Sequence, residues 1–134
     1  AIQDDKERRK SEEKQLAEQR RRDNALLNTY TTEAEIDGAR DRAISGATQS
    51  MQAIEARLKT ARGKIDALRK QMADWKAKGK PVPDSLKDEL AAAERDESKV
   101  AADLKGKETE IQNLRQKYEL DKARFVELSA SQKK

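Results

Sequence analysis

The sequence contains no cysteine and no histidine among its 134 residues. Disulfide bonds, thiol nucleophiles and the usual zinc sites need these side chains and are therefore excluded. Glycine and proline are scarce, with five and two residues, and aromatic residues make up only 3% of the chain. No apolar run approaches the length needed to span a membrane. So little apolar and aromatic material does not support a compact core of several layers.

Charged side chains, in contrast, make up 42% of the chain, with 30 basic and 26 acidic residues and a net charge of +4. Such a composition is compatible with disorder, but it is also typical of long helices where a helical period is present. The two signs are finely interleaved, which is typical of solvated helix faces. The longest basic run, Arg20 to Arg22, lies between Glu18 and Asp23 and has no aromatic residues beside it, so we do not expect nucleic acid as the partner.

A coiled-coil period is present between Ile44 and Leu128. From Ile44 to Trp75, apolar positions recur at strictly alternating steps of three and four residues, and the same pattern continues from Leu86 to Leu128. This spacing predicts two long helices that each carry one apolar seam. Three positions of the second seam are polar, namely Glu97, Lys107 and Asp121, and the first seam is polar at Asp37 and Arg40.

The segment Gly79 to Asp84 separates the two seams. Gly79 suits a left-handed helix end, Pro81 prevents continuation, and Pro83 suits the first turn of a new helix that Asp84 or Ser85 could cap. So short a loop predicts antiparallel neighbours. The fold class is therefore all-α: a long antiparallel coiled-coil hairpin over 32–134, with helices at about 32–79 and 84–129, preceded by a charged N-terminal helix and joint over 1–31. Two hairpin alignments remain open, one placing Met72 opposite Ala93 and the other shifted by one heptad.

The N-terminal segment is nearly all polar, so its predicted helix has no core of its own and needs a partner to be stable. Asn28 to Thr31 should interrupt it, because short polar and β-branched residues compete with helical structure. Thr32 and Glu35 then form a predicted capping box at the start of the next helix.

Trp75, Lys76, Lys78 and Lys80 gather at the predicted hairpin turn. They could contact phosphate groups or anionic lipid. However, Trp75 is in phase with the seam, so we expect it to close the last apolar layer, with the lysines favouring the helix end.

The run from Arg21 to Ile44, together with the turn Gly79–Pro83, resembles a segment of uncharacterised exported coiled-coil proteins of proteobacteria. The matching residues are Arg22, Asp23, Leu26, Leu27, Thr29, Tyr30, Thr32, Glu33, Glu35, Ile36, Asp37, Ala39, Arg40, Asp41 and Arg42. The resemblance implies a periplasmic or envelope location. Since the chain opens AIQDD without methionine, we expect a processed or trimmed N-terminus.

These observations predict a non-catalytic structural or accessory protein of the bacterial envelope, acting as a helical spacer or scaffold in a larger assembly. We expect no enzyme activity, cofactor, metal or small-molecule substrate, because nothing in the pattern forms a pocket or phosphate loop. A protein partner is expected at the joint, through Leu26, Leu27, Tyr30, Ile36, Arg40 and Arg42. Homo-oligomerisation and a periplasmic holdase-type chaperone remain open alternatives. The sequence favours a membrane-surface or nucleic-acid-binding protein less than these alternatives.

Overall fold

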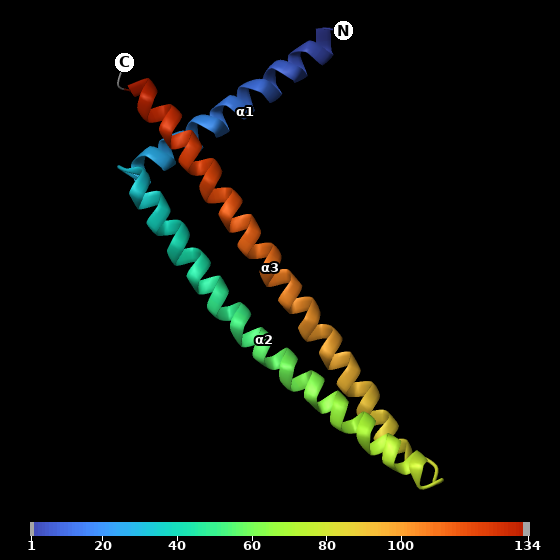
Figure 1. Cartoon of the computed structure of the whole chain (residues 1–134). Helices are drawn as coiled ribbons and strands as arrows, with labels where there is room; N and C mark the ends of the chain where they lie inside the picture. Colours follow the sequence, from blue (N-terminus) through green and yellow to red (C-terminus); the bar gives the residue numbers. More distant parts are fainter. Residues whose placement is uncertain (1, 133–134) are drawn as a thin grey trace. The chain divides into compact units, whose positions relative to one another are not determined.

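The computed structural model describes residues 2–132 and contains three helices over that range (Figure 1). Helix α1 spans Ile2–Thr29, α2 spans Glu33–Ala77 and α3 spans Asp84–Gln132. The predicted all-α class is confirmed. Residue 1 and residues 133–134, which the predicted segments include, lie outside the described range.

The contacts divide the chain into two units. One unit contains the chain up to Ala43 together with the chain from Leu114 onward, and the other contains Ile44–Asn113. Both α2 and α3 contribute to both units. We call them the joint unit and the hairpin unit.

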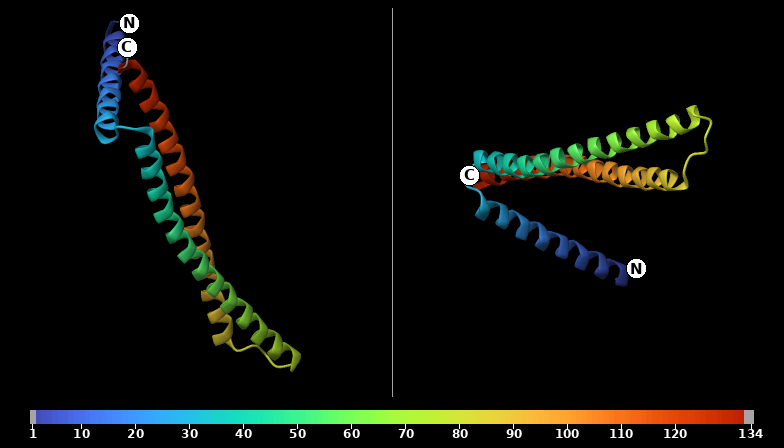
Figure 2. Two further views of the ribbon diagram at one scale, coloured as in Figure 1. Left: turned by 60° about the vertical axis from the view of Figure 1, so that its left-hand side comes forward. Right: turned by 90° about the horizontal axis from the view of Figure 1, so that it is seen from below.

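In the hairpin unit, α2 and α3 run in opposite directions on the two sides of a short loop (Figure 2). Its buried residues all occupy the predicted seam positions; they are Ala47, Leu58, Ala61, Ile65, Leu68, Leu86, Ala93, Val100 and Ile111. Next to the loop, Met72, Val82 and Leu90 pack against the cluster of Ile65, Leu68, Leu86 and Ala93. The antiparallel hairpin follows from the burial of these two seams against each other.

The end of α2 is held by a Schellman motif. Gly79 has a positive φ of 67°, its amide donates to the Lys76 carbonyl at 3.0 Å, and the Lys80 amide donates to the Trp75 carbonyl at 3.1 Å. These two bonds satisfy carbonyls that the helix leaves without partners. The predicted role of Gly79 is confirmed.

The start of α3 differs from the prediction. The Pro83 carbonyl accepts hydrogen bonds from the amides of Leu86 and Lys87, at 3.1 and 3.2 Å. Pro83 therefore occupies the N-cap position, and Asp84 is already the first helical residue. Asp84 contributes negative charge to the first turn, where the helix dipole favours it.

Two ion pairs join α2 to α3 in the hairpin unit: Arg62 pairs with Glu97 at 3.3 Å, and Arg69 pairs with Glu94 at 3.4 Å. The partner position on α3 falls as the position on α2 rises, which agrees with an antiparallel pairing of the two helices.

The joint unit contains α1, the first turns of α2 and the last turns of α3. Its buried apolar residues are Ile36 on α2 and Phe125 on α3, whereas α1 has none over its described length. The expectation that α1 lacks a core of its own is confirmed. Helix α1 ends at Thr29 and Tyr30 to Thr32 are not helical, so the predicted interruption begins two residues later than Asn28.

Candidate functional site

An ion pair joins α1 to α3 in the joint unit. Arg124 donates through Nε to Asp23 Oδ1 at 2.9 Å and through Nη2 to Asp23 Oδ2 at 2.8 Å. This bidentate geometry is the strong form of an arginine–carboxylate interaction. Gln19 donates a further hydrogen bond to Asp23 Oδ1 at 2.9 Å, and Arg124 also donates to Glu127 at 3.0 Å.

The charge state of this pair follows from these bonds. The side-chain hydrogen bond from Arg124, assisted by that from Gln19, lowers the pKa of Asp23 to about 2. The bond to Asp23 raises the pKa of Arg124, and the bond to Glu127 adds to this effect. Both groups are therefore charged at every ordinary pH, so this ion pair is not a physiological pH switch.

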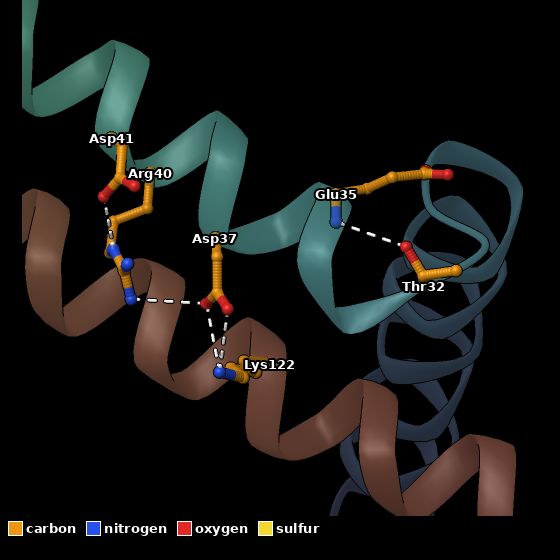
Figure 3. Close-up of polar contacts among 6 residues, drawn as sticks. All are labelled: Thr32, Glu35, Asp37, Arg40, Asp41 and Lys122. Carbon is orange, nitrogen blue, oxygen red and sulfur yellow. Dashed lines mark hydrogen bonds and ion pairs between the residues drawn. The ribbon is translucent and has the colours of Figure 1, made fainter.

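The connection between α1 and α2 uses a modified capping box (Figure 3). The Glu35 amide donates to Thr32 Oγ1 at 3.3 Å, as predicted. The Glu35 carboxylate, however, does not return to the Thr32 amide. It accepts from the backbone amide of Thr31 at 3.1 Å and from the Thr31 hydroxyl. The hydroxyl bond, followed by the amide bond, lowers the pKa of Glu35.

A second polar cluster joins α2 to α3 next to the cap (Figure 3). Lys122 Nζ donates to both oxygens of Asp37, at 3.0 and 3.1 Å, while Arg40 donates to Asp37 at 3.3 Å. Arg40 also donates to Asp41 at 3.0 Å, and this bond is the main cause of the raised pKa of Arg40. Asp37 and Arg40 are the polar seam positions that the sequence predicts, and here they satisfy each other.

The six predicted partner-binding residues have different environments. Ile36 is only 1% exposed, so it belongs to the core and is not available to a partner. Leu26, Leu27 and Tyr30 are half-buried. Arg40 is already bound to two carboxylates, whereas Arg42 is exposed and lines a shallow hollow that also contains Tyr30 and Glu35.

An open groove runs between α1 and α3 within the joint unit. Its lining residues are Gln19, Arg22, Asp23, Ala25, Leu26, Thr29, Tyr30, Lys117, Leu120, Asp121 and Arg124. Leu120 is 63% exposed, so a large apolar side chain of this groove is open to solvent. Leu120 is not among the site residues predicted from the sequence. It could have been identified there as a leucine that does not fall on the α3 seam.

Trp75, Lys76, Lys78 and Lys80 lie in the hairpin unit, around the end of α2. The three lysines are exposed, as predicted for a turn. Trp75 is 37% exposed, so the prediction that it closes the last seam layer is only partly met.

The residues described by the structure contain no cluster of three or more acidic side chains that could hold a metal ion. Among these residues, no helix has the length and apolar character needed to cross a bilayer. Comparison of the sequence with protein-family models finds no match, and the comparisons with curated proteins and with solved structures also find none. The resemblance of the Arg21–Ile44 segment to exported proteins stays a prediction.

Proposed function

We propose that this chain is a non-catalytic accessory protein of the bacterial envelope, a helical scaffold that binds one protein partner through the groove between α1 and α3. The observation that carries the proposal is the exposed Leu120 side chain beside half-buried Leu26 and Tyr30. Exposed apolar surface of this kind within a groove is typical of a protein-binding site.

The occupant that best suits this groove is an amphipathic helix of another protein. Ala25, Leu26 and Leu120 offer apolar contact along the groove. Arg22 and Lys117 also line it with largely exposed side chains, and each makes a long ion pair within its own helix, with Glu18 at 4.0 Å and with Asp121 at 3.8 Å. A helix with a narrow apolar stripe flanked by acidic residues would match both features. We therefore expect an acidic amphipathic helix as the bound element.

The envelope location has separate support. It rests on the resemblance of Arg21–Ile44 to exported proteins. Fractionation of the native cells tests it directly: the protein is expected with periplasmic markers, and recovery with cytoplasmic markers would refute the location without affecting the groove.

Site-specific photo-cross-linking tests the partner. A photoreactive residue replaces Leu120 in one variant and Val126 in a control variant, because Val126 is also an exposed apolar residue of α3 but does not line the groove. One adduct of fixed mass is expected from position 120 in native cells and not from position 126. The Leu120→Asp variant should lose the same partner in affinity capture.

The alternative functions give different results in the same experiment. A broad ladder of adducts from both positions, rich in unfolded envelope proteins, would support a holdase-type chaperone and refute a single-partner scaffold. Adducts between two copies of this chain would identify the groove as a homo-oligomer interface.

A further inference from the structure

The surface around the end of α2 has a property that the seam does not explain. We call Trp75, Lys76, Lys78 and Lys80 the basic tip. Trp75 is the only tryptophan of the chain, and it keeps 37% of its surface exposed although its position is in phase with the buried seam residues. The large seam residue before it, Met72, packs against the core cluster.

Only Lys76 lies in the last turn of α2, where the helix dipole favours a basic side chain. Helix α2 ends at Ala77, so Lys78 and Lys80 lie beyond the helix. Ion pairs within the described part of the chain include none of the three ammonium groups. The Schellman bonds fix the backbone at Lys80, so the loop presents these side chains from a defined turn.

We propose that the basic tip binds anionic lipid headgroups at a membrane surface. Lysine ammonium groups near an anionic leaflet are attracted to its phosphates, and an exposed indole is suited to the boundary between headgroups and acyl chains. Asp74 and Asp84 flank the three lysines and offset part of their charge. The indole is therefore needed beside the electrostatic attraction.

A nucleic acid is the other polyanion to consider. Sequence-independent binding of single strands uses several aromatic platforms along a basic groove, whereas the basic tip has one tryptophan on a turn. The exposed indole of Trp75 fits an interface that is partly apolar. The observations thus favour lipid, and nucleic acid becomes an outcome of the test.

Trp75 is a built-in reporter because the full chain has no other tryptophan. Vesicles of phosphatidylcholine and phosphatidylglycerol in equal parts are titrated into the protein while the emission spectrum is recorded. A blue shift of the emission and co-sedimentation with these vesicles are expected, with little of either for pure phosphatidylcholine. Added salt should weaken binding, because exposed charges are screened over about 10 Å at 0.1 M ionic strength.

The decisive comparison uses two variants of equal net charge. One replaces Lys76, Lys78 and Lys80 with glutamine, and the control replaces Lys59, Lys64 and Lys70, which are exposed on α2 in the same unit. Each lysine near an anionic surface strengthens membrane binding about fivefold, so the tip variant should bind the anionic vesicles on the order of 100-fold more weakly than the control variant. Circular dichroism should show equal helicity for both variants.

Equal vesicle binding by the two variants would overturn the proposal, because the net charge of the protein alone would then explain the binding. Absence of any blue shift or sedimentation with the unmodified protein would also overturn it. Tip-dependent binding of a fluorescent oligonucleotide without vesicle binding would assign the basic tip to nucleic acid instead. Leu120→Asp should keep full vesicle binding, so this inference can fail or succeed separately from the proposed groove.

Discussion

The substitution Gly79→Ala tests the turn of the hairpin most directly. Gly79 adopts a φ of 67°, in the left-handed region, and its amide is part of the Schellman motif. A Cβ built at this position would meet nothing within 4 Å, so steric crowding by neighbours does not contribute. The whole effect of the substitution should come from the backbone conformation.

The expected magnitude follows from this separation. Placing alanine in the left-handed region costs about 1–2 kcal/mol. Gly63 provides the matched control, because it also lies in the hairpin unit and its added Cβ would meet nothing within 4 Å, but it lies inside α2. Alanine is more favourable than glycine in a helix by roughly 0.5–1 kcal/mol, so Gly63→Ala should stabilise the protein.

Urea titrations followed by circular dichroism and by Trp75 fluorescence measure both variants against the parent. The two substitutions should change the free energy of unfolding in opposite directions. Gly79→Asn should lose less stability than Gly79→Ala, because asparagine tolerates the left-handed region. If Gly79→Ala stabilised the protein as Gly63→Ala is expected to, the assignment of a left-handed helix end at Gly79 would be wrong. The defined turn that presents the basic tip would then be wrong as well.

Three further substitutions test the remaining contacts. Asp23→Asn should speed amide exchange in α1 but not in the hairpin unit. The pKa of Asp23 in the folded protein, about 2, lies below its ordinary value of 3.8, so the stability that Asp23 contributes is present above about pH 4 and is lost as the pH falls through 2. The acid-induced loss of amide-exchange protection in α1 near pH 2 should therefore disappear in this variant. Thr32→Ala removes the cap of α2 and should cost about 1 kcal/mol in a urea titration, whereas a loss below a few tenths would contradict the cap. Leu58→Ala, at a buried position, should cost about 2–5 kcal/mol, and a loss near zero would show that the seam is not packed there.

The seam and the two ends of α2 are predictable because they depend on local spacing and local chemistry, whereas the prediction for the start of α3 is wrong, since Pro83 and not Asp84 or Ser85 is its N-cap. Alternating steps of three and four keep one helix face apolar, so the spacing alone identifies the buried positions of the hairpin unit. Gly79 is identifiable because only residues that tolerate the left-handed region end a helix in this way. Thr32 is identifiable from its hydroxyl at the first turn of α2.

Other features depend on contacts that local spacing does not encode. Asp23 and Arg124 are separated by 101 positions, and nothing in either segment identifies the other as its partner. The hairpin alignment stays open at the level of sequence because a repeat of seven residues fits equally well after a shift of one heptad. The Glu35 carboxylate binds Thr31 and not the Thr32 amide, which is a local alternative that the capping-box pattern does not distinguish.

The placement of α1 links stability to the proposed groove. Helix α1 contributes no buried side chain among its described residues, and a charge-assisted pair at Asp23 connects it to α3. Partly exposed pairs of this kind contribute far less than an apolar core, so we expect the docked arrangement of α1 to be easily shifted toward an undocked one. A partner helix that covers Leu120 and Leu26 contacts the docked arrangement only, and its apparent affinity is reduced by the fraction of molecules in which α1 is undocked. Under the proposed function, binding would therefore order α1, and its nearly all-polar composition would be that of a segment that completes its packing with another protein.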